Sequence, residues 1–230
     1  MKYFVALFVG LLTGAVLFGI GFYYNPFMNQ TVISPLAVTN EQVIDLSFSA
    51  VPQEGILYTN DGDSVPAPFP TRVAKLLEPA VSDTSIFVTE LHDGGGDLAG
   101  IGIKFSSESE STRLFEGEAL ANSVWHLYLP GRGTMLLDQT ENYWPYIREV
   151  RIPARLSSGE NWRGSFHGIM TNGPSALGTA RVSGGSGLHA GLETEAVESL
   201  TARGYSVVQG PVAMTRTLTI MLPRVDSTGE

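Results

Sequence analysis

Apolar and polar residues alternate through most of the chain beyond residue 41, as they do in strands that bury one face. Turn-forming residues, chiefly Gly, Pro, Asn and Asp, separate these alternating runs. A short helix is indicated at 71–78, before Pro79. We therefore predict an all-β domain, an antiparallel β-barrel or alternatively a β-sandwich. The expected strands cover 42–50, 56–59, 86–91, 98–105, 124–129, 134–137, 147–156, 161–170, 179–183, 192–200, 205–209 and 214–222.

The clearest of these strands spans 161–170. Trp162, Phe166 and Met170 fall on one of its faces together with two glycines, and glycines on that face permit a bend or a cavity. We expect this aromatic face to look into the barrel. Trp162 and Phe166 are then the candidate ligand-binding residues for a small lipophilic molecule.

Three glycines, Gly184, Gly185 and Gly187, stand close together between two alternating runs. Such a cluster indicates positive φ angles or the close approach of another segment, and both exclude a Cβ atom. The pattern predicts strand, turn and strand. It also predicts that 164–170 and 184–200 lie on neighbouring antiparallel strands of a closed barrel.

The segment Val182–Gly191 reads Val-Ser-Gly-Gly-Ser-Gly-Leu-His-Ala-Gly. It resembles the Val-x-Gly-Gly-Thr-Gly-x-Phe-Ala-Gly segment of the allene oxide cyclase and dirigent superfamily. His189 stands where that family has Phe, and a Leu-Glu-Thr sequence replaces its glycine-containing continuation. The resemblance covers 162–222 and implies an eight-stranded antiparallel barrel. The catalytic carboxylate of that family lies outside this segment, so no catalytic residue is transferred to this chain.

The first 24 residues predict a transmembrane anchor, because 4–24 are uncharged and close to the roughly 20 residues that cross a bilayer. A cleaved signal peptide is the alternative, although no small-x-small cleavage site follows the apolar run. Lys2 favours an N-terminus in the cytoplasm and a single pass through a bacterial inner membrane. Residues 25–40 are then a linker, and 41–230 form a periplasmic domain.

Composition narrows the choice of partners. Without Lys2, 13 basic residues face 23 acidic ones, a net charge of 13 − 23 = −10 beyond the anchor. Such a charge argues against nucleic acid and against anionic membrane surfaces as ligands. Four basic residues between 148 and 163 indicate an anion or partner patch, or a solvated face paired with acids. Gly10 and Gly14 have the Gly-x-x-x-Gly spacing that can bring two membrane helices together as a homodimer.

The sequence contains no recognisable motif for a metal or cofactor site. The chain has no Cys, which excludes disulfides, and its four His are dispersed without the spacing of metal ligands. We therefore predict neither a metal nor a cofactor.

Glu198 is the one weak catalytic candidate. It shares a face with the apolar residues of its strand by period two, and burial among them would raise the pKa of its carboxyl group into the range of a general acid or base. The alternative is that this carboxylate reaches water or an arginine. We expect a membrane-anchored, non-catalytic domain that binds a small lipophilic ligand or docks on a membrane complex as an accessory subunit. A cyclase or isomerase acting on a lipophilic substrate inside the barrel is the alternative, and the sequence leaves open whether the chain is an enzyme.

Overall fold

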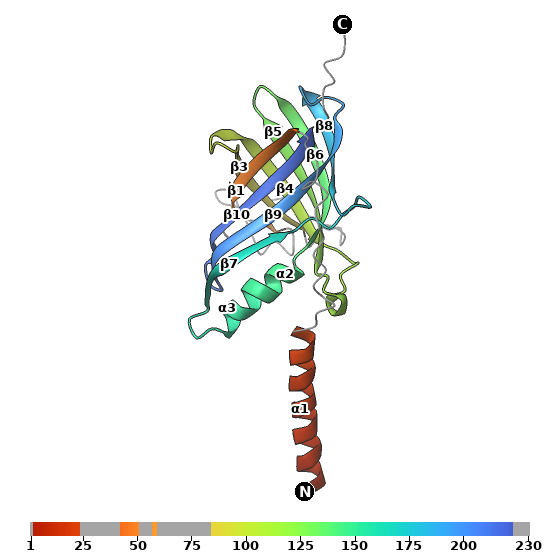
Figure 1. Cartoon of the computed structure of the whole chain (residues 1–230), viewed down its shortest axis with the longest axis vertical. Helices are drawn as coiled ribbons and strands as arrows, with labels where there is room; N and C mark the ends of the chain where they lie inside the picture. Colours follow the sequence, from red (N-terminus) through yellow and green to blue (C-terminus); the bar gives the residue numbers. More distant parts are fainter. Residues whose placement is uncertain (1, 24–41, 51–56, 59–83, 223–230) are drawn as a thin grey trace, which may run out of the picture.

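The computed structural model describes residues 2–23, 42–50, 57–58 and 84–222 (Figure 1). The predicted helix at 71–78 and the predicted linker at 25–40 lie outside these residues. The helices are α1 (Lys2–Tyr23), η6 (Leu114–Glu116), α2 (Trp144–Tyr146), η7 (Ile147–Arg151) and α3 (Ile152–Leu156). The strands are β1 (Gln42–Ser49), β2 (Leu57–Tyr58), β3 (Thr84–His92), β4 (Leu98–Glu108), β5 (Leu120–Leu129), β6 (Gly133–Asn142), β7 (Asn161–Ile169), β8 (Ala180–Gly187), β9 (Glu193–Ser206) and β10 (Gly210–Leu222).

The strands form one antiparallel sheet that closes on itself, which confirms the predicted all-β barrel class. Around the ring the order is β1, β10, β9, β8, β6, β5, β4 and β3. β3 returns to β1 through the pair Ser47 and His92. β2 adds to the other end of β3, where Leu57 pairs with Ile86. Closure of the ring through the pair of Ser47 and His92 leaves fewer backbone groups unpaired than an open sheet would have at its edges.

β7 and β8 lie one after the other along the same edge of β9. Ile169 of β7 pairs with Ser199, and Ala180 of β8 pairs with Ala196, so both strands run antiparallel to β9. They share one place in the ring, so the strands that the structure describes occupy eight positions around it. The expected neighbourhood of 164–170 and 184–200 is confirmed only where β7 meets β9, because the glycine end of β8 pairs with β6.

The glycine cluster is placed as the sequence predicts for two of its three members. Gly187 has a φ of +65°. A Cβ atom on Gly184 would lie 1.5 Å from the backbone oxygen of His189, so that position excludes a side chain. Gly185 is less constrained, since its Cβ would first meet the Thr134 hydroxyl at 2.8 Å. The turn between β8 and β9 comes after the cluster.

The chain between β6 and β7 is helical, so the strand predicted at 147–156 is wrong. α2, η7 and α3 follow one another without a break, and we call Trp144–Leu156 the closing helix. Asn142 precedes it and accepts the Trp144 N–H at 3.0 Å, as an N-terminal capping side chain does. The π-helical turn η7 lies just before Pro153, which has no N–H for a helical hydrogen bond. After Trp144 at its start, the buried positions of this segment are four residues apart, a helical spacing: Tyr146, Val150 and Ala154.

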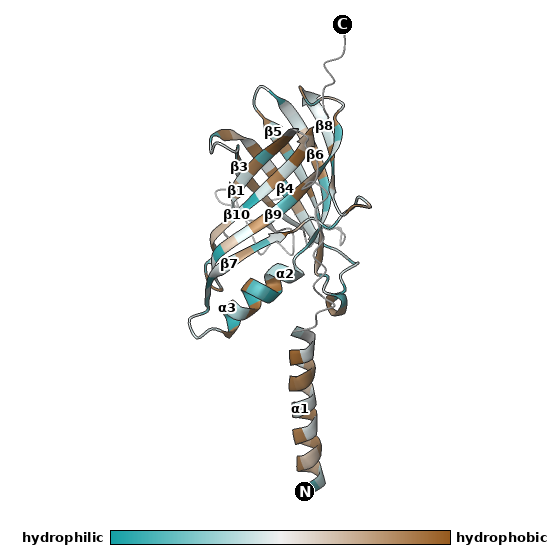
Figure 2. Cartoon of the chain, viewed as in Figure 1, coloured by the Kyte–Doolittle hydropathy of each residue, from teal (hydrophilic) through white to brown (hydrophobic). Residues whose placement is uncertain are grey.

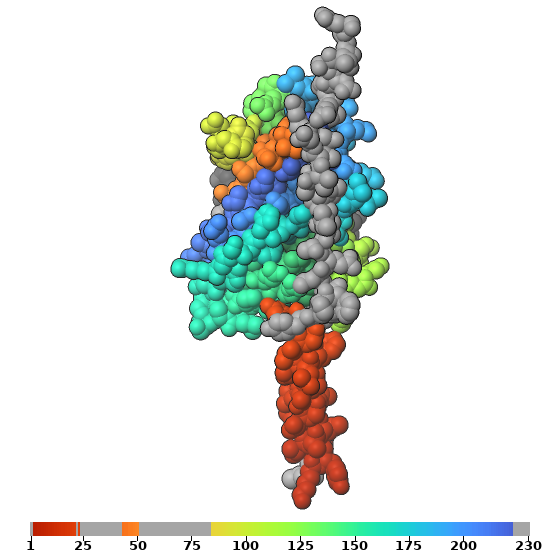
Figure 3. Space-filling model, viewed as in Figure 1, coloured from red at the N-terminus to blue at the C-terminus, as the bar shows by residue number. Residues whose placement is uncertain are grey.

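α1 approaches the barrel at the end where the closing helix lies, which we call the closed end (Figures 1 and 3). The Tyr23 hydroxyl donates to the backbone oxygen of Arg148 at 3.2 Å. Lys2–Gly21 is long and apolar enough to cross a membrane, and α1 is coloured hydrophobic over most of its length (Figure 2). At 1.5 Å per residue such a helix spans about 30 Å, the thickness of a bilayer's hydrocarbon core.

Candidate functional site

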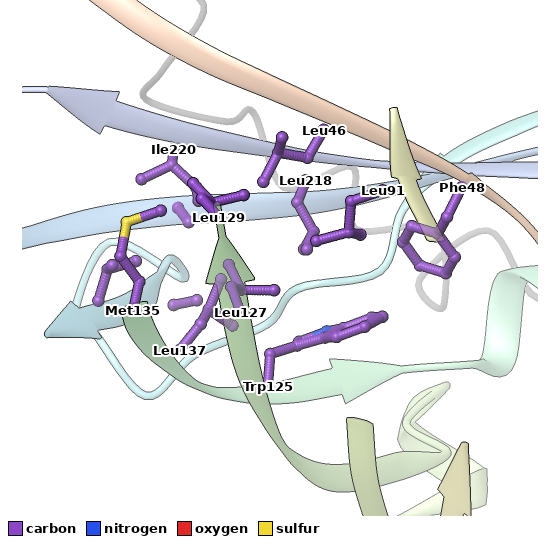
Figure 4. Packing of buried hydrophobic residues seen from close by; sticks show 13 residues of the cluster. Leu46, Phe48, Leu91, Trp125, Leu127, Leu129, Met135, Leu137, Leu218 and Ile220 are labelled. Atoms are coloured by element: carbon purple, nitrogen blue, oxygen red, sulfur yellow. The ribbon is translucent and has the colours of Figure 1, made fainter. Parts of the chain in front are cut away.

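Two apolar clusters fill the two ends of the barrel interior. The far-end cluster contains Leu46, Phe48, Leu91, Trp125, Leu127, Leu129, Met135, Leu137, Ala180, Val182, Ala196, Leu218 and Ile220 (Figure 4). The closed-end cluster contains Tyr146, Val150, Phe166, Met170, Leu200, Ala202 and Met214. The closing helix supplies two members of the second cluster, Tyr146 and Val150, so it covers that end of the barrel as part of its core.

A layer of polar side chains separates the two clusters, and we call it the charged layer. Its members follow from period two along each strand, since an interior face remains interior from one end of a strand to the other. On β10, for example, Arg216 lies between Met214 and Leu218, and each of these two neighbours belongs to a different cluster. The charged layer consists of Lys104 on β4, Ser123 on β5, Gln139 and Glu141 on β6, Glu198 on β9 and Arg216 on β10.

Glu198 lies at the centre of this layer with no exposed surface. Its Oε1 accepts from Arg216 Nη1 at 2.6 Å and from Lys104 Nζ at 3.1 Å. Its Oε2 accepts from Lys104 Nζ at 2.9 Å and from Trp125 Nε1 at 3.1 Å. The Gln139 amide also donates to Oε2. Five donated hydrogen bonds therefore occupy the carboxylate from all sides.

Glu141 is the second buried carboxylate, and the same two cations hold it. Lys104 Nζ lies 2.7 Å from Oε2, and Arg216 Nη1 lies 3.3 Å from Oε1. The Ser123 and Tyr143 hydroxyls donate to it at 2.8 and 3.0 Å. Two carboxylates and two cations make the layer electrically neutral, which is how buried charges are tolerated.

Thr171 ties this layer to the break between β7 and β8. Its hydroxyl donates to Gln139 Oε1 at 2.9 Å and accepts the Glu198 N–H at 2.7 Å. Thr171, between β7 and β8, therefore orients the Gln139 side chain, and the Gln139 amide group then donates to the carboxylate of Glu198.

The pKa of Glu198 moves in the direction opposite to the one expected from the sequence. Burial alone would raise it, but the charges of Lys104 and Arg216 and the hydrogen bonds that these side chains donate lower it to about 2. Burial likewise opposes the charge of Lys104, yet Glu141 and Glu198 hold its pKa above the ordinary value. The pKa of Arg216 is also raised. Burial alone would lower it, but the electrostatic interactions of the guanidinium group with Tyr143, Glu198 and Glu141 are stronger than this effect. All these groups keep their charges through the neutral range.

Tyr143 borders the layer on the side of the closing helix. Arg216 donates to its hydroxyl through Nη1 and Nη2 at 3.3 and 3.2 Å, and the guanidinium carbon lies 5.5 Å from the centre of its ring. Burial is the main cause that raises the pKa of this phenol, so it remains protonated and donates to Glu141.

The two predicted ligand-binding residues lie in the closed-end cluster and not in the charged layer. Phe166 is buried, and Trp162 is half-buried and packs against the same cluster. Tyr146 makes edge-on contacts with Phe166 and Tyr205, with ring centres 6.0 and 6.2 Å apart. The structure thus brings Trp162 and Phe166 together with aromatic residues that the sequence analysis did not select.

Lys104, Glu141 and Arg216 are the site residues that the sequence analysis missed. Glu141 and Arg216 share a face with apolar residues of their strands by period two, the same signal that identified Glu198. Lys104 carries no such signal, because its period-two neighbours are Gly102 and Ser106. Among the residues that the structure describes, no group of three or more His, Cys, Asp and Glu side chains is arranged to hold a metal ion. The chemistry that the layer offers is charge pairing between two carboxylates and two cations.

No protein-family model and no curated protein matches the chain. A solved structure that it resembles is that of a nonspecific heme-binding cyclase that catalyses a [4 + 2] cycloaddition during neoabyssomicin biosynthesis. The identity is 10%, the TM-score is 0.38, and the match covers 85% of this chain and 74% of that one. At this level of likeness nothing about activity or ligand follows for the present chain.

Proposed function

We propose that this chain is a membrane-anchored, non-catalytic barrel domain that docks on a membrane protein complex as an accessory subunit. In this proposal α1 crosses a bacterial inner membrane with its N-terminus in the cytoplasm, and the barrel lies in the periplasm. The observation that carries the proposal is the closed charged layer, in which the interior polar groups bind one another. The outer surface of the barrel is then the part that acts on a partner.

The ionised state of Glu198 supports the proposed absence of acid–base catalysis. A general acid or base must exchange a proton near the working pH. The pKa of Glu198 is about 2, and those of Lys104 and Arg216 are raised, so none of them exchanges a proton under neutral conditions. A substrate would also have to displace hydrogen bonds made at 2.6 to 3.1 Å in order to reach Glu198.

A second candidate function is the binding of a small lipophilic ligand at the closed-end cluster. It is favoured by the aromatic side chains of Tyr146, Phe166 and Tyr205, with Trp162 beside them, next to the end of α1. Such a ligand would reach this cluster from the membrane. The cyclase or isomerase alternative places a rearrangement of the same ligand there, and the resemblance at Val182–Gly191 is its support.

Purification of the full chain from its native membrane in a mild detergent separates these functions. An accessory subunit is recovered with a protein partner in a fixed ratio, and the partner remains after Phe166→Leu, because that change lies inside the barrel. A ligand-binding domain is recovered with an extractable lipophilic molecule, and Phe166→Leu lowers its amount. Recovery of the molecule without a protein partner would refute the accessory function.

A further inference from the structure

The charge of the chain is distributed unevenly, and the closing helix lies in its basic region. Residues 147–163 contain four arginines and two glutamates, a sum of 4 − 2 = +2, whereas the whole chain carries −9. Arg151 and Arg155 are exposed on the closing helix, and Arg163 is exposed on β7 beside it. Within the described part of the chain, none of these three forms an ion pair.

The contact between α1 and the closing helix fixes where this region lies when α1 spans a membrane. Tyr23 follows the apolar run by two residues, so it lies at the level of the lipid headgroups. Because its hydroxyl binds the backbone of Arg148, the closing helix lies at that level as well. Leu156, at the end of α3, is 81% exposed and adds an apolar side chain to the basic ones.

The other connection at the closed end has the opposite charge. Residues 106–118 contain four glutamates and one arginine, a sum of 1 − 4 = −3. In Figure 1 this yellow-green connection and the closing helix lie on different sides of the upper end of α1. An anionic surface attracts the closing helix and repels the connection, so it would tilt the barrel with the closing helix towards the lipid.

We propose that the closing helix binds anionic lipid headgroups through Arg151 and Arg155, and that this contact orients the barrel on the membrane. The inference rests on the proposed anchoring by α1. Guanidinium groups suit phosphate because they donate two parallel hydrogen bonds. The net charge of the domain argues against anionic surfaces as ligands of the whole molecule, but it does not describe this one face.

The test uses the full chain reconstituted into liposomes of phosphatidylcholine, with or without phosphatidylglycerol. Since the chain has no Cys, Ser158→Cys in the exposed turn after α3 gives a single site for a fluorescent label. Quenching of the label by headgroup-nitroxide lipid measures how closely the closing helix approaches the bilayer. We expect stronger quenching in the liposomes that contain phosphatidylglycerol, and we expect added salt to weaken the difference.

Replacement of both arginines, Arg151→Gln with Arg155→Gln, should remove this difference, since each basic side chain near an anionic surface changes the bound population by about fivefold. The control replaces Arg132, in the turn at the far end, and Arg181, on β8, by Gln, and it should leave the quenching unchanged. Equal quenching in both lipids, or equal quenching in the two double variants, refutes the proposal. Failure of the unlabelled chain to float with either liposome refutes the anchoring by α1 instead, and the inference with it.

Discussion

Lys104→Met should destabilise the barrel strongly, because Lys104 joins both buried carboxylates. Its Nζ lies 2.7 Å from Glu141 and 2.9 Å from Glu198, and its side chain is 1% exposed. One such pair at an effective dielectric constant of about 20 has a Coulomb energy of about 6 kcal/mol, partly offset by the cost of burial. Removal of one partner from a buried pair costs about 3–5 kcal/mol, a large part of the roughly 5–15 kcal/mol that stabilises a typical domain.

Denaturation of the full chain by guanidinium chloride in mild detergent, followed by near-ultraviolet circular dichroism, measures this loss. Arg113→Met is the matched control, since its pair with Glu116 is exposed at the surface and should contribute about 0–1 kcal/mol. Adding Glu141→Gln to Lys104→Met restores charge balance and should recover about 0.5–3 kcal/mol through their coupling. Equal losses for Lys104→Met and Arg113→Met would contradict the account of the charged layer.

Three further predictions concern other parts of the chain. Gly184→Ala should lower the free energy of unfolding by about 1–3 kcal/mol in thermal or chemical denaturation, because the new Cβ atom would meet the His189 backbone. Gly185→Ala should lower it less, because its Cβ atom would meet only a side-chain hydroxyl. Equal losses for the two variants would contradict this prediction. Because the pKa of Glu198 is lowered from its ordinary value of 4.5 to about 2, the ionised carboxylate stabilises the folded chain at pH values above 4.5. This stabilisation is lost as the pH falls towards about 2, and the free energy of unfolding should then decrease by roughly 3 kcal/mol. Glu198→Gln should reduce this loss of stability at acid pH. An unchanged loss in the variant would show that other groups cause it. A periplasm-specific reporter fused to the C-terminus should be active, and an inactive reporter, or a chain recovered without its first ~25 residues, would refute the topology.

The sequence predicts most of the strands because the barrel interior repeats every second residue. The strand predicted at 205–209 is wrong, since β9 ends at Ser206 and a turn leads to β10. Period two also placed Glu198 inside, together with Ala196 and Leu200 on the same face. What it could not supply was the surroundings of the carboxylate. Lys104 is 94 residues away in the chain, so the lowered pKa depends on a pairing that only the closed ring creates.

The closing helix shows where the alternating pattern fails. Val150, Ile152, Ala154 and Leu156 alternate as in a strand, yet Val150 and Ala154 also have helical spacing with Tyr146. A proline within a strand is typical of an edge strand, whereas Pro153 here follows a π-helical turn. Asn142 as a capping residue and Pro145 near the start of α2 were the local signals for a helix.

The central claim is that the buried polar side chains of the charged layer pair with one another. The ionisation of Glu198 tests this claim most directly. Nuclear magnetic resonance of the full chain with isotopically labelled glutamate carboxyl carbons, with Glu198→Gln to assign the signal, follows this group through a titration. We predict that the Glu198 signal does not change between pH 4.5 and 10.5 and begins to shift only as the pH falls towards about 2. A carboxyl group that instead titrates near neutral pH would contradict the closed layer and would restore Glu198 as a candidate general acid or base.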